Sequence, residues 1–129
     1  MRSARCLSLL LLLLLLSGCN PVNLVCGSAR PRPTLSTITP STIAYAQMPG
    51  AFQMVLTGGN FVASSVVLFN GNTIATTVNT SAQITVTITT SMIAGPGSYS
   101  VQVQTPGGNS GTIGCSSGGE SATLTFTVT

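Results

Sequence analysis

The feature that most constrains this chain is a two-residue alternation of apolar and polar side chains, which recurs from Leu35 to the final residues. Between Ile84 and Thr89 apolar residues alternate strictly with threonine. Successive side chains of a β-strand point to opposite faces, so this period is typical of strands with one buried and one solvated face. The expected strands are marked by Leu35 to Thr39, by Phe52, Met54 and Leu56, by Val67 and Phe69, by Ile74 to Val78, by Ile84, Val86 and Ile88, by Tyr99, Val101 and Val103, and by Ala122, Leu124, Phe126 and Val128.

Turn-forming residues separate these segments, and no stretch after residue 34 keeps a helical period. Asn70-Gly71 between two strands is a strong signal for a two-residue hairpin. About seven short strands with turns every 8–12 residues indicate a β-sandwich. The sequence therefore predicts an all-β fold, with residues 34–129 forming one domain.

Residues 1–18 form a separate segment, which does not belong to the predicted domain. Arg2 and Arg5 precede an apolar run from Leu7 to Leu16 that is interrupted only by Ser8. The run is well short of the roughly 20 residues that a membrane-spanning helix needs. Positive charge, a short apolar core and small residues in this order are typical of a secretory signal peptide.

Leu16-Ser17-Gly18-Cys19 resembles the lipobox of bacterial lipoprotein signal peptides. The resemblance implies cleavage between Gly18 and Cys19, a diacylglycerol on the Cys19 sulfur, and acylation of the new amino terminus by a fatty acid such as palmitate. It places the protein in the bacterial cell envelope, anchored to a membrane by lipid. Asn20 follows the cysteine, which favours the outer membrane or cell surface. The alternative is an ordinary signal peptide in which Cys19 occurs by chance.

Charge is scarce in the rest of the chain. The whole sequence has four arginines, one glutamate and no histidine, and only Arg30, Arg32 and Glu120 remain after residue 18. General acid–base catalysis needs positioned titratable groups, and nucleic-acid binding needs clustered basic residues. The hydroxyls have no histidine or lysine to activate them as nucleophiles. We therefore expect no enzyme, no cofactor and no nucleic-acid partner.

Residues 19–33 have the composition of an extended tether. Pro31 and Pro33 alternate with arginine, and proline at such spacing stiffens a chain toward the polyproline form. Arg30 and Arg32 either touch anionic lipid headgroups or belong to a plain solvated spacer.

The ordered motifs of residues 34–129 resemble those of IPT/TIG domains, which are immunoglobulin-like β-sandwiches. The resemblance implies that Gly58 allows a close backbone approach or a positive φ, and that Phe61 plugs one end of the sandwich. These domains share no catalytic site, and members outside transcription factors act as spacers or contact modules. The matching motifs are Thr39-Pro40-Ser41, Phe52-x-Met54-x-Leu56-x-Gly58-x-Asn60-Phe61, Val67-x-Phe69-Asn70-Gly71, and Gly97-x-Tyr99-x-Val101-x-Val103-x-Thr105-Pro106-Gly107-Gly108.

Cys26 and Cys115 form an even pair once Cys6 leaves with the signal and Cys19 carries lipid. In an immunoglobulin-like sandwich the start of the first strand and the loop between the last two strands lie at the same pole. A disulfide between Cys26 and Cys115 is therefore expected in an oxidising compartment. The alternative is two free or differently paired thiols. Two cysteines without histidine make an incomplete zinc site, so no metal is expected.

Three functions remain open. One is a lipid-anchored, non-catalytic domain that contacts a protein or a glycan, with Tyr45 as a candidate contact residue near an early turn. The second is a structural spacer without a ligand, and the third is an enzyme, which the residue inventory disfavours. Tyr99 lies on the inward face by period, so we expect it in the core.

Overall fold

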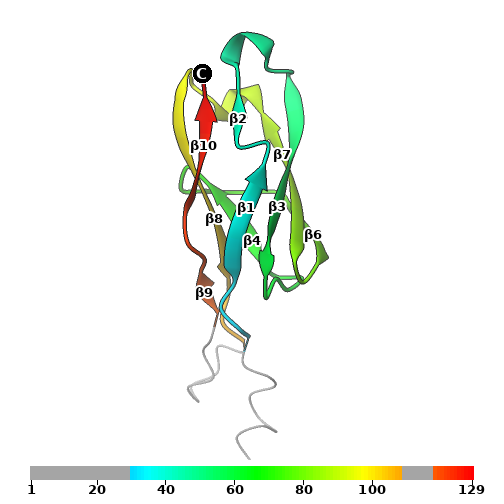
Figure 1. Ribbon diagram of the computed structural model, residues 1–129. Coiled ribbons are helices and arrows are strands. Elements are labelled where there is room, and N and C mark those ends of the chain that lie inside the picture. The colour runs from blue at the N-terminus through cyan, green and yellow to red at the C-terminus, as the bar shows by residue number, and fades with distance from the viewer. Residues whose placement is uncertain (1–29, 109–117) are drawn as a thin grey trace, which may run out of the picture.

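A computed structural model describes residues 30–108 and 118–129, in which two β-sheets pack face to face (Figure 1). Two short 3₁₀ turns, η2 (Tyr45–Gln47) and η3 (Thr90–Met92), connect strands at one end. The four-stranded sheet has the order β1 (Thr34–Thr39), β3 (Ala51–Gly59), β7 (Gln83–Thr89) and β6 (Thr76–Thr80). The six-stranded sheet has the order β2 (Thr42–Ile43), β10 (Leu124–Val128), β8 (Gly97–Thr105), β4 (Val66–Phe69) and β5 (Asn72–Ile74), with β9 (Gly119–Glu120) beside β8.

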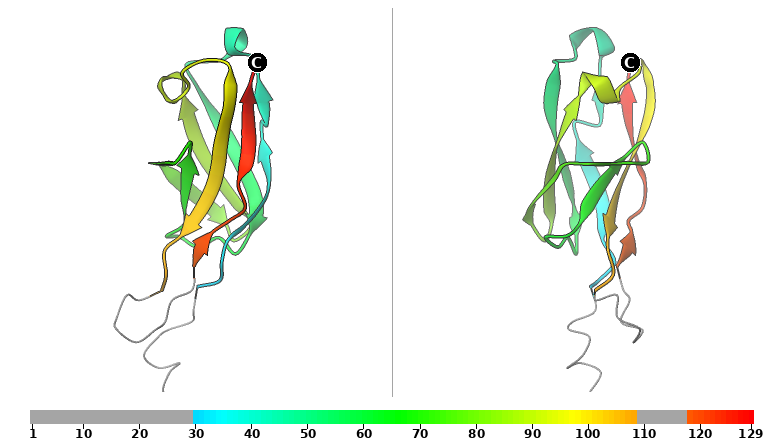
Figure 2. Two further views of the ribbon diagram at one scale, coloured as in Figure 1. Left: turned by 90° about the vertical axis from the view of Figure 1, so that its left-hand side faces the viewer. Right: turned by 180° about the vertical axis from the view of Figure 1, so that it is seen from behind.

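The strand order is that of an immunoglobulin-like sandwich, which confirms the predicted fold class. In the letters used for that fold, the sheets read A-B-E-D and A′-G-F-C-C′. The first strand is shared between them, because β1 pairs antiparallel with β3 whereas β2 pairs parallel with β10. The chain changes sheets at the cis peptide bond between Thr39 and Pro40. The two views in Figure 2 show the layers from the side and from behind.

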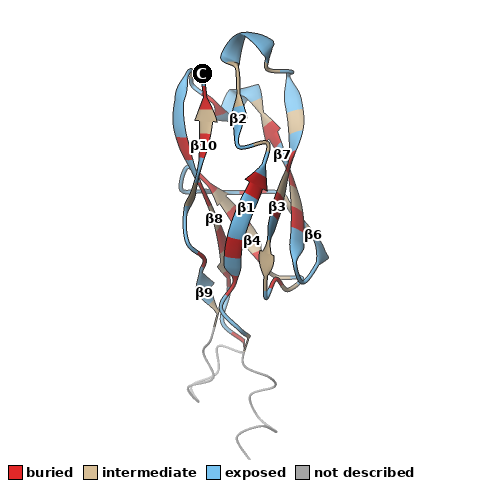
Figure 3. Ribbon diagram, in the orientation of Figure 1, coloured by how far each residue is buried: buried red, intermediate tan, exposed pale blue. Residues whose placement is uncertain are grey.

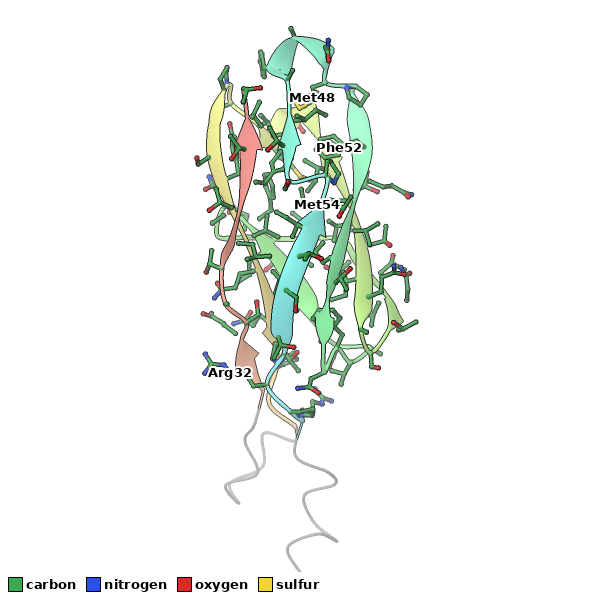
Figure 4. All side chains as sticks on the ribbon, in the orientation of Figure 1. Arg32, Met48, Phe52 and Met54 are labelled. Carbon is green, nitrogen blue, oxygen red and sulfur yellow. The ribbon has the colours of Figure 1, made fainter. Side chains whose placement is uncertain are left out.

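The core lies between the sheets and is built from the predicted alternation. Met54, Leu56 and Phe126 are fully buried, and the apolar residues of β7 and β8 are buried as well. Figure 3 shows buried segments on strands of both sheets. Met54 and the partly buried Phe52 lie between the layers in Figure 4. Phe69 stacks on Tyr99 with ring centroids 5.6 Å apart. Burying each such side chain contributes about 1.5–3 kcal/mol, so this interior is the main source of stability.

The predicted hairpin at Asn70-Gly71 is confirmed. Phe69 pairs with Asn72 across a two-residue loop, and the φ angles of Asn70 and Gly71 are 50° and 80°. Positive φ at both positions is the mark of a type I′ turn, whose twist matches that of the flanking strands. Asparagine and glycine adopt this backbone more readily than other residues, which is why the sequence signal was reliable.

The segment from Ile74 to Val78, predicted as one strand, is divided between the two sheets. Ile74 ends β5 in one sheet, and Thr76 begins β6 in the other. The Thr76 hydroxyl accepts from the Val67 amide at 2.9 Å and donates to the Ile74 carbonyl at 2.9 Å. Because Ile74 and Val78 both face the core, from different layers, the period alone could not reveal the crossing.

The last strand begins later than predicted, at Leu124, and Ala122 is exposed. Ser121 interrupts the ladder, since its hydroxyl accepts from the Val103 amide at 2.9 Å and donates to the Ala122 carbonyl at 2.8 Å. Three residues, 121–123, lie opposite two residues of β8, which is the count of a β-bulge. The extra residue turns Ala122 away from the core.

The chain packs tightly against Gly58 at one end of the sandwich. A Cβ built there would collide with the Thr34 carbonyl oxygen and lie 2.8 Å from the Phe61 ring, whereas one at Gly50 would meet nothing within 4 Å. Gly58→Ala should therefore lower the free energy of unfolding by about 1–3 kcal/mol. Gly50→Ala should leave it unchanged or raise it by about 0.4–1 kcal/mol. Urea unfolding of both variants checks this, and equal stabilities would contradict the close approach at Gly58.

Candidate contact surface

The domain has two chemically different ends. At the entry pole, defined by Arg30–Pro33, Asn60, Pro106 and Gly118–Glu120, the described chain enters the sandwich. At the far pole, defined by Ile43–Gly50, Thr90–Gly97 and Thr129, lie both 3₁₀ turns. The strand register separates these ends, because Gly59 of β3 pairs with Thr34 whereas Ala51 pairs with Thr89.

All charged residues of the described chain gather at the entry pole. The Arg30 guanidinium donates to the Pro106 carbonyl at 3.2 Å, and Arg32 Nε donates to the Glu120 carbonyl at 2.7 Å. Asn60 Nδ2 donates to the Arg32 carbonyl at 3.0 Å. Figure 4 shows Arg32 at this end of the molecule. These three hydrogen bonds form a clasp that joins the entering chain to the residue after β3, to the turn after β8 and to β9.

The clasp changes the expectation for the end of the tether. Arg30 and Arg32 hydrogen-bond to the sandwich and Pro33 is fully buried, whereas Pro31 and Arg32 stay exposed, so this part of the segment is attached to the domain. It also confirms that the start of the first strand lies beside both flanks of the β8–β9 loop. Cys19, Cys26, Cys115, the signal segment 1–18 and tether residues 19–29 lie outside the described residues, so the expected lipid and disulfide stay predictions.

The titratable side chains that the structure describes are few. They are Arg30, Arg32, Glu120, Tyr45 and Tyr99. The Glu120 carboxylate accepts from the side-chain amides of Gln102 at 3.3 Å and of Gln104 at 3.5 Å. Residues 30–108 and 118–129 contain no group of three or more histidine, cysteine, aspartate or glutamate residues that could hold a metal ion.

Tyr99 lies in the core, as its period predicts. Its hydroxyl donates to the Gly95 carbonyl at 2.8 Å and accepts from the Gly95 amide at 3.2 Å. A tyrosine near the start of the sixth main strand that bonds a few residues upstream is the tyrosine corner of immunoglobulin-like sandwiches. Its role is therefore structural.

The far pole carries the exposed apolar residues. Tyr45 and Met92 retain 45% and 37% of their accessible surface, and they are the exposed large hydrophobic side chains of the described chain. The Tyr45 amide donates to the Thr129 carbonyl at 2.7 Å, and the Thr90 amide donates to the Gly50 carbonyl at 3.1 Å, so both turns are fastened to this end. We call the exposed apolar residues here the far-pole surface: Tyr45, Ala46, Pro49, Met92, Ala94 and Pro96.

A hollow of about 340 Å³ extends from Met92 toward the β4–β5 turn. Phe69 and Ile74 contribute apolar atoms to it, whereas Asn70, Asn72, Thr73 and Ser91 contribute amides and hydroxyls. Its volume is at the lower end of the range for small-ligand sites. Phe69 is only 2% exposed, so its ring offers no stacking platform to a ligand.

The outer faces of the two sheets are polar but carry almost no charge. Exposed or half-buried side chains from β1, β3 and β7 form adjacent rows on the four-stranded sheet. On the other sheet, serine and glutamine of β8 lie beside the half-buried Val66 and Leu68 of β4. The rows on the four-stranded sheet contain Thr37, Thr57 and Gln83, then Thr39, Val55 and Thr85, then Gln53 and Thr87.

Sequence reasoning found Tyr45 but missed Met92 and the hollow. Met92 and Ile93 are adjacent apolar residues after a strand, and the first is exposed whereas the second is buried. A two-residue period cannot assign them, because the chain leaves the extended form after β7 and turns through η3, which contains Met92. Within the described residues no helix is long and apolar enough to span a membrane. A scan of protein-family models and a search of curated proteins gave no match for the chain.

The two tyrosines provide a matched test of these assignments. Tyr99→Phe removes a hydroxyl that makes two hydrogen bonds, and it should lower the free energy of unfolding by about 1–2 kcal/mol. Tyr45→Phe makes the same chemical change at an exposed site and should stay within about 0.5 kcal/mol of the wild type. Thermal and urea unfolding measure both. A larger loss at Tyr45 than at Tyr99 would overturn the assignments.

Proposed function

We propose that this chain is a lipid-anchored, non-catalytic domain of the bacterial cell envelope, of the IPT/TIG type, which contacts a protein or glycan partner. The signal peptide, Cys19 lipidation and the tether give its attachment, and the outer membrane or cell surface is the favoured location. The far-pole surface is the contact site, with Tyr45 and Met92 as its principal residues.

The observation that carries this proposal is the opposite placement of the entering chain and the exposed apolar residues. A tether that arrives through Arg30–Pro33 would hold the entry pole toward the membrane. The far pole would then face outward, presenting an aromatic ring and a flexible thioether, while Arg30, Arg32 and Glu120 lie at the opposite end. Tyrosine supplies both apolar contact and a hydroxyl, and methionine adapts to irregular surfaces, so both suit a contact surface.

A second candidate is a structural spacer without a ligand of its own. The threonine, serine and glutamine side chains that make up most of the outer faces favour it, because such side chains interact well with water. A spacer function accounts for the polar side chains on the outer faces of the sheets. A contact function accounts for the two large apolar side chains that stay exposed at one end. An exposed apolar patch is a recognised mark of interaction sites, so we favour the contact function.

The anchor is tested by the mature amino terminus. Mass spectrometry of protein from the native membrane fraction should find Cys19 as the first residue, with diacylglycerol on sulfur and an acylated amine. Cys19→Ser should leave the signal peptide uncleaved, because the lipid-transfer step has lost its nucleophile. An unmodified terminus at another residue would sink the anchored function.

The contact surface is tested by site-specific photo-crosslinking in intact cells. A photoreactive amino acid at position 45 or 92 should give a discrete adduct with a partner. The same residue at exposed positions 57 or 87 should give none, since those side chains lie on the outer face of the four-stranded sheet and not on the far-pole surface. Adducts at none of the four positions would favour the spacer, and adducts only at 57 and 87 would move the contact site to the sheet.

A further inference from the structure

We propose that Asn70-Gly71 is a covalent modification site at which Asn70 converts spontaneously to aspartate and isoaspartate. The Gly71 main-chain nitrogen attacks Asn70 Cγ, and a nitrogen–carbon bond closes a five-membered imide. The carboxamide nitrogen leaves as ammonia and carries away the Gly71 proton. Water then opens the imide at either carbonyl, giving aspartate or isoaspartate. The reaction needs water but no oxidant or reductant, and it does not depend on the proposed function.

The surroundings of Asn70 favour this reaction. Asn70 and Gly71 are both exposed in the two-residue loop between β4 and β5. A Cβ at Gly71 would meet nothing within 4 Å, so no part of the chain beyond its two neighbours crowds this residue. The Asn70 main-chain amide donates to the Ser100 carbonyl at 2.8 Å, and the Asn70 carbonyl accepts from Asn72 Nδ2 at 3.3 Å. Within the described residues its carboxamide makes no hydrogen bond and can rotate toward Gly71.

Three other asparagines provide controls inside the same molecule. Asn60 donates to the Arg32 carbonyl at 3.0 Å, and Asn79 donates to the Thr85 hydroxyl at 2.6 Å, so both carboxamides are engaged. Asn72 donates to the Asn70 carbonyl. Each of the three precedes a residue with a side chain, Phe61, Thr80 or Thr73 respectively, which crowds the main-chain nitrogen that would attack.

The conversion would alter the molecule in two ways. Two arginines against one glutamate leave the described chain with a single positive charge, which a new carboxylate cancels. Asn70 lines the hollow beside Met92, so the new charge lies at the edge of an otherwise uncharged site. Isoaspartate also adds a methylene to the main chain of a loop that has only two residues, which disturbs the pairing of Phe69 with Asn72.

The experiment follows Asn60, Asn70, Asn72 and Asn79 in one sample. The folded mature chain is incubated at neutral and mildly alkaline pH, and peptide mass mapping with fragmentation measures conversion to aspartate and isoaspartate at each site. Conversion should be several-fold faster at Asn70 than at Asn60, Asn72 or Asn79. Its rate should rise with pH, because the attack requires a deprotonated Gly71 nitrogen. Equal rates at the four sites, or conversion at Asn70 only after unfolding in urea, would overturn the proposal.

Two variants separate the consequences. Asn70→Gly fits the same type I′ turn but has no carboxamide, so the variant should stay unconverted at position 70 while the other sites are unaffected. Asn70→Asp carries the new charge without the longer main chain. Aged protein that unfolds at a lower temperature than Asn70→Asp would assign the loss to isoaspartate, and equal temperatures would refute the proposed damage to the hairpin.

Discussion

The structure depends on the closure of two apolar sheet faces over one another. Each sheet carries apolar side chains on its inner face, such as Ile84, Val86 and Ile88 of β7. Water would reach these side chains if the opposite sheet were absent. Hydrophobic burial supplies the stabilisation, since the few charges lie at one end and exposed ion pairs contribute little. The sharing of the first strand between both layers, through β1 and β2, closes one side of this interior.

Hydroxyls take over where the strand ladders break. Ser65 and Thr105 are buried, and their hydroxyl oxygens form a hydrogen bond at 2.8 Å. The Ser65 hydroxyl also accepts from the Val62 amide. The Thr76 hydroxyl accepts from a main-chain amide at the crossing between the sheets, and the Ser121 hydroxyl accepts from one at the bulge before β10. An unpaired buried amide costs about 1–3 kcal/mol, so each of these small side chains offsets a real penalty. The composition rich in threonine and serine thus serves the interior as well as the solvated faces.

The elements that the sequence predicted are those specified by local chemistry. The alternation located the main strands, Asn70-Gly71 located the hairpin, and the period placed Tyr99 in the core. The division at Ala75, the bulge before Leu124 and the docking of Arg30–Pro33 depend on hydrogen bonds between residues distant in sequence. Tyr45 was identifiable from its turn, whereas the exposure of Met92 follows from the direction of η3, which no periodicity encodes.

The clasp at the entry pole has a mechanical consequence. Tension that reaches the domain through its amino-terminal segment would first load the hydrogen bonds of Arg30, Arg32 and Asn60, before it reached β1. If the opposing force acts at the far pole, the pull runs along the strand axes. The β1–β3 and β2–β10 ladders would then be sheared, with their hydrogen bonds strained together instead of one after another. A domain pulled between these two ends would therefore resist unfolding through many main-chain hydrogen bonds at once.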